Sequence, residues 1–525
     1  MPTEGPPRPL SDTAREVARK LLHMSMGLFA LALHWLTPWQ GALCALVALA
    51  HNLWLFPLYG YGKLLRPEER RTGYSGMLGY PAVVLALCLL FPHPLAALDP
   101  VRAAAGGGPP RVLWAAAGAW ALLAFGDAFA ALAGIFLRGP VLPWNPKKRW
   151  SGLLAFIVMG GGLATLMAYF VAYGDLRFTW GGVQDLLFTC VLAAVVGGVV
   201  ETLPHQLDDN LTVPLACGLV LVFFAGFSWS GFLSGVGHAL GDGPGLAALL
   251  AFNALLGSAA WLRRWVTGGS ALLGILWGTL VALGAGWEGY GFLLLFYLIA
   301  NGTTYVGAKR KKARGIAEAD GGRRGGGSVF SKGLFPALFA LVSPTAMVSS
   351  LAVYAADTAA SEIGKLSAGR TWLLAARRRG RAGEAGGVSV LGSLAGSGAL
   401  LLFSLFYALG FALQAGGAGS GLTRFQVLLL RDDLGRFAVP TAQAGLLAQL
   451  PLLALSLFLA GLLCFFLESV LNETVGAKGW YPKEVIHLFL GGVAGAAPFV
   501  SAAAAAAPVV SGAGACCRAS NSAAA

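Results

Sequence analysis

Long apolar runs separated by short polar segments recur along nearly the whole chain. A run of about 20 apolar residues is long enough to cross the hydrocarbon core of a bilayer as a helix. The pattern therefore predicts an all-α, polytopic transmembrane protein with roughly 15 crossings. We expect two short spans broken at Ser343-Pro344, and the other crossings near residues 21–37, 40–58, 74–92, 112–137, 151–173, 184–200, 211–232, 245–262, 269–286, 289–307, 388–414, 441–467 and 484–510.

The composition excludes a water-soluble fold. Hydrophobic residues make up 57% of the 525 residues and charged residues 12%, whereas soluble proteins contain roughly 25% charged residues. Mean hydropathy is +0.69. The bilayer is therefore the expected surrounding of this chain.

The basic residues predict the orientation of the chain. Its net charge is +13, and one set of alternate loops is poor in cations, containing only Arg102, Arg111, Arg177, Arg424, Arg431 and Arg436. The cation-rich loops should face the cytoplasm. We expect a multi-pass protein of a bacterial inner membrane or a plastid membrane, with these loops facing the cytoplasm or stroma and no nucleic-acid partner.

Polar motifs divide the chain into segments. Residues 1–240 carry one set of motifs and residues 308–510 carry another, and we expect two membrane domains there. Apolar helices at 241–307 connect them. The Ala-rich tail at 511–525, which includes Cys516 and Cys517, is of low complexity, and we assign it no role.

Charged side chains at or inside apolar spans are costly and therefore mark candidate functional sites. A first cluster, Glu16, Arg19, Lys20 and His23, opens the first span. Lys20 and His23 are three residues apart and share a helix face. For Arg19 and Lys20 an interfacial anchor is the alternative, since basic side chains at span ends extend toward headgroups.

A second cluster combines an acid with three cations. Asp127 lies in the apolar string FGDAFAALAG, and NPKKRWSG at 145–152 supplies Lys147, Lys148 and Arg149. An acid that holds Mg²⁺ beside cations that neutralise nucleotide phosphates is the combination that phosphoryl transfer needs. A solvated positive loop explains the cations equally well, but it does not explain Asp127.

The third cluster is an acidic loop on the otherwise basic side. The string VETLPHQLDDNLTVPL at 200–215 contains Glu201, His205, Asp208, Asp209 and Asn210. Its oxygen ligands suit a hard cation such as Mg²⁺. A merely solvated acidic loop is the alternative.

A fourth cluster lies in the second half. Asp357 and Glu362 flank small residues in ADTAASEIG, which allow close helix packing around a metal. The string GGVSVLGSLAG at 386–396 follows, and its backbone N–H groups can face phosphate. The candidates here are Gly386, Gly387, Ser389 and Gly392 in the turn, and Glu468, Asn472 and Glu473 at the end of a later span.

Residues 12–235 resemble the phytol kinase and dolichol kinase family through the first-span cluster, GDAFAALAG, PWNPKKRWSG and VETLPHQLDDNLTVPL. Members of this family are membrane enzymes that use CTP to phosphorylate a polyprenyl-type alcohol. A similar acid-then-KK-W-G arrangement occurs in CDP-diacylglycerol synthase-like proteins, which also use CTP. Both resemblances imply CTP, and only the first implies an alcohol acceptor.

Residues 300–500 resemble the membrane family that includes phytyl-phosphate kinase, through GIAEADGGRRGGGSV, ADTAASEIG and GGVSVLGSLAG. This resemblance implies a second phosphorylation, from monophosphate to diphosphate. The string LESVLNETVGA departs from the Asp-Ser-Leu-Leu-Gly-Ala-like string expected in that family. Glu468 retains an acid there, but the glycine is missing.

The combined hypothesis is a CTP- and Mg²⁺-dependent kinase of phytol, geranylgeraniol or a similar prenyl alcohol in the bilayer, with further phosphorylation of the product by the second half. The metal ligands would be Asp127, Asp208, Asp209, Asp357, Glu362 and Glu468. Lys147 and Lys148 would stabilise the transferred phosphoryl group. The nucleotide would contact Lys20, His23, Arg149, Asn210, Gly386, Gly387, Ser389 and Gly392.

Two other functions remain open at this point. A cytidylyltransferase would form a CDP-lipid from the same nucleotide. A secondary transporter would use intramembrane acids to bind coupling ions, although we find no internal repeat of the kind common in transporters. The general base, which is His23 or an acid, and the oligomeric state are also left open.

Overall fold

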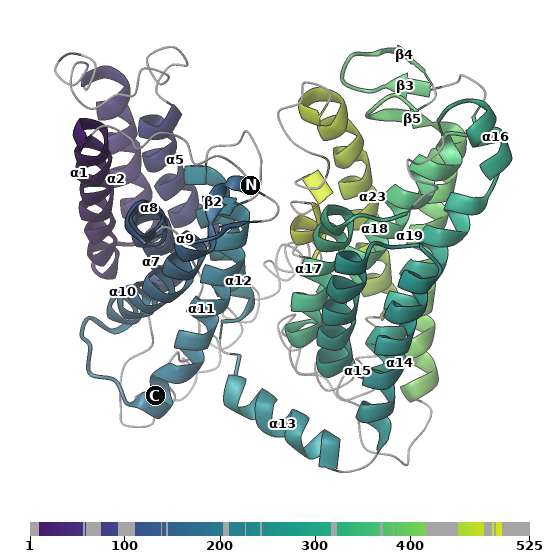
Figure 1. The fold of residues 1–525 in the computed structure, drawn as a ribbon, viewed down its shortest axis with the longest axis horizontal. Helices are drawn as coiled ribbons and strands as arrows, with labels where there is room; N and C mark the ends of the chain where they lie inside the picture. The colour runs from purple at the N-terminus through teal and green to yellow at the C-terminus, as the bar shows by residue number, and fades with distance from the viewer. Residues whose placement is uncertain are drawn as a thin grey trace, which may run out of the picture. The chain divides into compact units, whose positions relative to one another are not determined.

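The computed structural model divides the chain into two compact units, unit 1 (Met1–Ser234) and unit 2 (Gly235–Ala525) (Figure 1). The assignment of kinase-like domains to 1–240 and 308–510 stays a prediction. The structure describes residues 10–55, 58, 75–92, 111–137, 139–142, 145–202, 209–225, 227–241, 244–316, 323–367, 371–381, 383–415, 450–476, 483, 486–487 and 490–495.

Unit 1 is a bundle of helices whose core lies on α7 (Trp114–Ala121), where almost every residue is buried. Thr37 begins one of the outer helices with a capping box, because its hydroxyl accepts from the Gln40 N–H while the Gln40 side chain accepts from the Thr37 N–H. The other helices are α1 (Leu10–Gly27), η1 (Leu28–His34), α2 (Pro38–Ala50), η2 (His51–Leu55), α5 (Ser75–Leu90), α11 (Trp180–Thr202) and α12 (Asp209–Phe223).

Two π-helical turns of unit 1 pack against each other. The turn η3 (Leu122–Gly126) joins α7 to α8 (Asp127–Phe136), and η4 (Phe156–Gly160) joins α9 (Trp150–Ala155) to α10 (Gly161–Tyr173). Glycine is required where they meet, since a Cβ on Gly160 would lie 3.0 Å from the Gly126 Cα. Such turns are frequent at functional sites, and Asp127 follows η3 directly.

The crossing expected at 211–232 in unit 1 is shorter in the structure, because the helix breaks before residue 229. Helix α12 ends at Phe223, and α13 (Trp229–Gly241) begins six residues later. Asp185 of α11 accepts hydrogen bonds from the Trp229 N–H at 3.0 Å and the Ser230 N–H at 3.3 Å. The hydropathy pattern does not reveal this break because aromatic side chains lie on both sides of it, with Trp229 stacked on Phe224.

Unit 2 is built around α18 (Pro344–Gly364), most of which is buried. This helix packs against α15 (Gly268–Tyr305), α17 (Gly326–Val342), α19 (Val390–Ala415) and α23 (Leu450–Leu471). Ser343 ends α17 and caps α18, since its hydroxyl accepts from the Ala346 N–H at 3.1 Å. The break expected at Ser343-Pro344 is therefore confirmed, with proline at the first helical position.

The longest helix of unit 2, α15, contains a kink. Gly286 has φ +61°, a conformation that glycine adopts at little cost. The kink lies between the spans expected at 269–286 and 289–307. The remaining helices are α14 (Pro244–Leu262), α16 (Ala308–Ala313) and η7 (Asn472–Gly476).

Two small antiparallel sheets depart from the expected all-α fold. In unit 1, β1 (Val141–Leu142) pairs with β2 (Asn145–Arg149). In unit 2, β3 (Thr371–Leu373) lies between β4 (Arg378–Gly380) and β5 (Gly387–Ser389), beyond the ends of α18 and α19 (Figure 1). Strands of two to five residues are too short to show a hydropathy pattern.

The polytopic helical class is confirmed. Among the described residues, seven helices are long and apolar enough to cross a membrane, and three shorter apolar helices accompany them. The total of roughly 15 crossings stays a prediction, because most of the expected span at 484–510 lies outside the described residues.

Candidate active sites

Asp127 lies against the first helix of unit 1. Lys20 Nζ donates to Asp127 Oδ2 at 2.6 Å, and His23 Nε2 lies 3.8 Å from the same oxygen. Arg19 instead pairs with Glu16 on α1, at 2.6 Å. The structure thus brings the first and second clusters together, and Lys20 is a buried partner of an acid rather than only an interfacial anchor.

The β1–β2 hairpin positions the three cations of the second cluster. Asn145 is buried, donates from Nδ2 to the Thr202 carbonyl at 3.0 Å and accepts from the Lys147 N–H at 3.1 Å. Arg149 donates to the Gly139 carbonyl at 2.6 Å. Asn145 therefore ties β2 to the end of α11, and Arg149 closes the hairpin.

Lys148 is the cation of this hairpin that reaches the acids. Its Nζ donates to Glu201 Oε1 and lies 4.0 Å from Asp209 Oδ2. Burial by itself lowers the pKa of Lys148, but the carboxylates of Glu201 and Asp209, with a smaller contribution from Asp127, outweigh it and raise the pKa above its usual value. Lys148 therefore stays positively charged at neutral pH.

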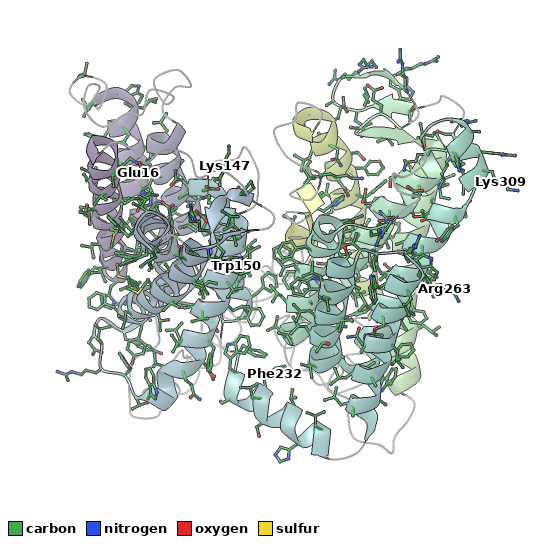
Figure 2. The ribbon with its side chains drawn as sticks, viewed as in Figure 1. Glu16, Lys147, Trp150, Phe232, Arg263 and Lys309 are labelled. Carbon is green, nitrogen blue, oxygen red and sulfur yellow. The ribbon has the colours of Figure 1, made fainter. Side chains whose placement is uncertain are left out.

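The other residues predicted for unit 1 are less constrained. Lys147 is exposed on β2 (Figure 2) and has no side-chain partner among the described residues. Asn210 follows Asp209 in the first turn of α12. Asp208 and His205 lie outside the described residues. We define the unit 1 cluster as Lys20, Asp127, Lys148, Glu201 and Asp209, with His23 beside them.

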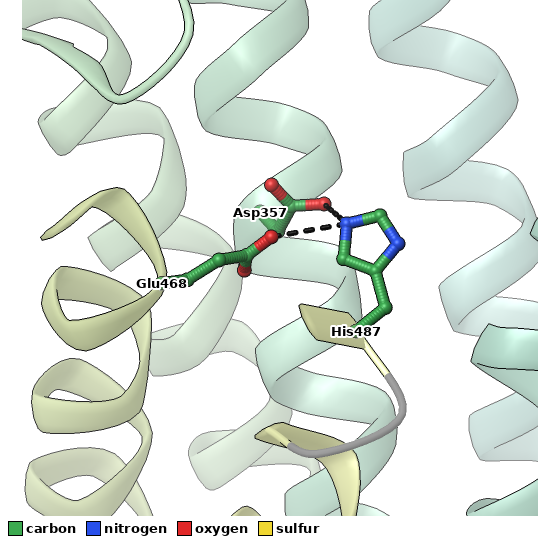
Figure 3. Close-up of side chains that lie close together, drawn as sticks. All are labelled: Asp357, Glu468 and His487. Atoms are coloured by element: carbon green, nitrogen blue, oxygen red, sulfur yellow. Dashed lines mark ion pairs between the residues drawn. The ribbon is translucent and has the colours of Figure 1, made fainter. Parts of the chain in front are cut away.

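A second charged group forms in unit 2, where three buried side chains converge (Figure 3). His487 Nε2 lies 3.3 Å from Asp357 Oδ2 on α18 and 3.0 Å from Glu468 Oε1 on α23. One ligand atom from each residue lies within 4.8 Å of the other two. Asp357, Glu468 and His487 are called the unit 2 cluster below.

Neighbouring side chains fix the unit 2 cluster in place. Lys332 Nζ on α17 donates to Asp357 Oδ2 at 2.8 Å and to the Thr358 hydroxyl at 2.9 Å. The Tyr354 hydroxyl donates to the His487 carbonyl at 2.9 Å. The ammonium of Lys332 on α17 therefore fixes Asp357, and the Tyr354 hydroxyl on α18 fixes the backbone of His487.

The unit 2 cluster contains buried polar atoms without hydrogen-bond partners among the described residues. These atoms are Glu468 Oε1 and both ring nitrogens of His487. His487 Nε2 forms ion pairs with two carboxylate oxygens, whereas its Nδ1 has no polar partner among the described residues. Since buried polar atoms in folded proteins are rarely unpaired, this donor set of two acids and an imidazole fits a cation.

Glu362 lies apart from the unit 2 cluster. It follows Asp357 on α18, but its two oxygens accept from Lys311 at 2.6 Å and Lys365 at 2.7 Å. Lys311 also donates to the Thr303 carbonyl at the end of α15. Glu362 therefore ties α18 to α15 and α16, and its expected metal-binding role stays a prediction.

The Gly-rich segment at 386–396 packs α19 against its neighbours. Ser389 Oγ accepts from the Gly392 N–H at 3.1 Å. A Cβ on Gly392 would lie 2.8 Å from the Ala360 carbonyl oxygen, and one on Gly386, whose φ is +74°, would meet the backbone of Glu473. The structure gives these residues turn and packing roles, and their contact with phosphate stays a prediction.

Three residues of these sites were not assigned from the sequence. Lys332 lies in GSVFSKGLFPALF and His487 in EVIHLFLGG, so an ionisable side chain within an apolar stretch was the available signal. Glu201 was noted as an acid but not as the partner of Lys148, because pairing depends on the tertiary fold.

A family model and one relative each match a little under half of the chain. Residues 251–489 match the family described as integral membrane protein DUF92. An uncharacterized membrane protein of Synechocystis sp. is 34% identical to this chain over 269 residues, which cover 47% of this chain and 88% of that protein.

Plant phytol kinases are similar to a shorter part of the chain. Phytol kinase 1, chloroplastic, of Arabidopsis thaliana is 32% identical over 110 residues, and the probable phytol kinase, chloroplastic, of Triticum aestivum is 36% identical over 108 residues. Each alignment covers 20% of this chain and 35% of the plant protein. The chain thus spans about a third of the length of these kinases. No solved structure matches it.

Proposed function

This chain belongs to the integral membrane protein DUF92 family, and we propose that it phosphorylates a prenyl alcohol, such as phytol or geranylgeraniol, with CTP. The partial similarity to plant phytol kinases supports a lipid kinase. The observation that carries the proposal is the unit 1 cluster, in which lysines and carboxylates from distant parts of the sequence form ion pairs.

Lysines of the unit 1 cluster supply the charge that phosphoryl transfer needs. Catalysis of this reaction rests mainly on positioning and on stabilising charge at the transferred group. Lys148 lies on β2, and its side chain is 36% exposed. Its ammonium can therefore leave the Glu201 carboxylate and donate to a phosphate oxygen instead. Lys147 extends from the same strand and neutralises the remaining phosphates as a point charge.

Carboxylates of the unit 1 cluster fit Mg²⁺ that arrives with the nucleotide. Their oxygens are the hard ligands that this ion prefers. Asp209 is the most accessible acid of this cluster, with 42% of its side chain exposed, while Asp127 is oriented by Lys20. Asp127 and Asp209 would hold the ion, which would supply positive charge to neutralise the phosphates.

The lipid acceptor reaches the unit 1 cluster from the bilayer. Glu201 lies at the end of α11 and Asp209 at the start of α12. The ends of apolar helices lie near the membrane surface, where the hydroxyl of a dissolved prenyl alcohol and a water-soluble nucleotide can meet. His23, Asp127 and Asp209 are the candidate bases for the hydroxyl proton, since Glu201 is paired with Lys148.

For unit 2 we propose phosphorylation of the monophosphate to the diphosphate. The buried carboxylates of Asp357 and Glu468, with Lys332 beside them, support this assignment. Two activities in one chain would keep a poorly soluble intermediate at a high effective concentration.

The test for unit 1 uses membranes that contain the full chain, CTP labelled in its γ-phosphate, and phytol, geranylgeraniol or dolichol. Label should appear in the lipid monophosphate and diphosphate. Asp127→Asn should lower formation of the monophosphate by at least about 100-fold. Asp185→Asn is the matched control, because an amide oxygen can still accept the hydrogen bonds that begin α13.

The alternatives give different products. Transfer of label from the α-phosphate of CTP, and not from the γ-phosphate, would identify a cytidylyltransferase and refute the kinase. Ion-coupled uptake without any labelled lipid would identify a transporter. For unit 2, Asp357→Asn should abolish the diphosphate and leave the monophosphate unchanged, and equal loss of both products would contradict the division of labour.

A further inference from the structure

The unit 2 cluster differs from an ordinary buried ion network in its unpaired atoms. His487 is 5% exposed and Glu468 is 2% exposed. Nevertheless, Glu468 Oε1 and His487 Nε2 contact each other only as an ion pair and do not meet the criteria of a hydrogen bond among the described residues. Leaving such atoms unsatisfied away from water is costly. The arrangement indicates a ligand that binds between the carboxylates and the imidazole.

The geometry of the unit 2 cluster fits a single metal ion. His487 Nε2 is 3.3 Å from Asp357 Oδ2 and 3.0 Å from Glu468 Oε1, and the side chains point toward one another (Figure 3). Ligand atoms that are each about 2.0–2.2 Å from one ion lie roughly 3–4.4 Å apart. Small side-chain movements are therefore sufficient to form the site.

The backbone that carries His487 is anchored to α18. The Tyr354 hydroxyl donates to the carbonyl of His487 at 2.9 Å, and the Ser350 hydroxyl donates to the Gly491 carbonyl at 2.6 Å. Gly491 is pressed against the Tyr354 ring, so a larger residue would not fit there. The imidazole thus comes from a segment that is fixed relative to Asp357.

We propose that Asp357, Glu468 and His487 bind a divalent first-row transition metal ion of the Mn²⁺ type. Carboxylate oxygens suit both Mg²⁺ and Mn²⁺, whereas an imidazole ligand is characteristic of transition-metal sites. His487 therefore selects against Mg²⁺ as the resident ion. In this assignment His487 takes the place of Glu362 as the third ligand, because Glu362 is paired with Lys311 and Lys365.

The charge of the occupied site favours an anionic partner. Lys332 also donates to the Thr358 hydroxyl, so its ammonium keeps an acceptor when Asp357 turns an oxygen to the metal. Two carboxylates, Lys332 and a dication together carry a net positive charge, which attracts a phosphate group. This agrees with the phosphorylation proposed for unit 2, but metal binding does not depend on that reaction.

The test measures Mn²⁺ binding to the full chain in detergent, purified through a tag without histidine and treated with a chelator. Electron paramagnetic resonance follows the loss of the aqueous Mn²⁺ signal, and electron spin echo modulation detects nitrogen coordinated to the ion. We expect a tightly bound Mn²⁺ with nitrogen coupling that an excess of Mg²⁺ does not displace. No nitrogen coupling in the wild type, or displacement by equimolar Mg²⁺, would overturn the proposal.

Variants separate this site from the unit 1 cluster, which also contains a histidine. His487→Gln should remove the nitrogen coupling and weaken Mn²⁺ binding by more than the roughly 10–100-fold that loss of an outer partner costs. His23→Gln should retain both properties. Coupling that persists in His487→Gln would refute the assignment.

A second variant tests the site if the first one misfolds. If His487→Gln does not yield a monodisperse protein, Glu468→Gln keeps the size of the side chain and the imidazole. Weaker Mn²⁺ binding with retained nitrogen coupling would then support the site. Unchanged affinity in Glu468→Gln would refute it.

Discussion

The two charged clusters differ in how their carboxylates are neutralised. In unit 1, Asp127 and Glu201 each accept a hydrogen bond from a lysine, and Lys148 is partly open to solvent. In unit 2, Glu468 and His487 face each other without hydrogen-bond geometry, and both are buried. The unit 1 cluster has cations that can exchange partners, whereas in the unit 2 cluster Lys332 pairs with Asp357 and no lysine hydrogen-bonds to Glu468 among the described residues.

This difference predicts different consequences of mutation. Accessible lysines can leave a carboxylate for a phosphate, so their loss should affect activity. Buried ion pairs in unit 2 are shielded from water, and removing one partner leaves an uncompensated charge. Loss of a buried ion pair in unit 2 should therefore lower the stability of the folded protein. The following predictions test this contrast.

The largest effect is expected at the buried pair of Lys311 and Glu362, whose side chains are 2% and 1% exposed. Lys311→Met leaves Glu362 with Lys365 alone, and breaking a buried pair costs about 3–5 kcal/mol. Denaturation of the purified protein in detergent measures this loss. Lys309→Met, on the exposed side of the same helix (Figure 2), should leave stability unchanged, and equal destabilisation by both variants would contradict the structural role of Lys311.

In unit 1 the double variant Lys148→Met/Glu201→Gln removes both members of a pair, so no buried charge is left without a partner. Formation of the lipid monophosphate should fall by about 10²–10³-fold, because a donor to the transferred phosphoryl group is lost. Thermal stability should change little. Glu201→Gln alone retains Lys148 and should keep most of the activity at neutral pH; a loss equal to that of the double variant would assign catalysis to Glu201 instead.

Gly386→Ala tests whether the Gly-rich segment of unit 2 is under backbone constraint. Its φ of +74° and its approach to Glu473 should make alanine cost about 1–3 kcal/mol of stability. Gly398→Ala is the comparison, since a Cβ there meets no atom within 4 Å. That change should stabilise α19 by roughly 0.5–1 kcal/mol. Equal stability of the two variants would show that Gly386 tolerates a side chain.

The smallest effect concerns pH. The pKa of Lys148 is raised above its usual 10.5, although burial opposes this, because Glu201 and Asp209 favour the ammonium form. Its charge is therefore retained as pH rises through the neutral range and is lost only at higher pH. Glu201→Gln removes the largest raising contribution, so the alkaline fall in kcat/KM should move to lower pH. An unchanged alkaline limb would exclude Lys148 as the group that titrates.

The sequence predicts helices better than it predicts pairings. The break at Ser343-Pro344 was predictable because proline has a defined place at a helix start. The strands around Lys148 were not, since they are too short for a periodic signal. Asp127 and Lys20 were recognised as candidates, but their contact joins residues 107 positions apart, and no local pattern encodes it.

The shared role of two acids in the fourth cluster stays a prediction, although helical geometry bears on it. Asp357 and Glu362 were grouped because they are close in sequence. Five residues along an α-helix correspond to about 500° of rotation, so the two side chains point roughly 140° apart. Helical geometry alone therefore indicates separate partners for them, whereas the approach of Glu468 and His487 to Asp357 required the tertiary structure.

The π turn η3 contains one residue more than the regular helix it interrupts, and Asp127 follows it immediately. Because such a turn absorbs the extra residue locally, deleting one codon from Leu122–Gly126 would restore a regular helix and leave the Asp127 carboxylate directed toward Lys20. Deleting one codon from the regular helix Trp114–Ala121 would instead rotate Asp127 by about 100° relative to the start of that helix. Both deletions shorten the same apolar span by one residue, so hydropathy alone would not distinguish them.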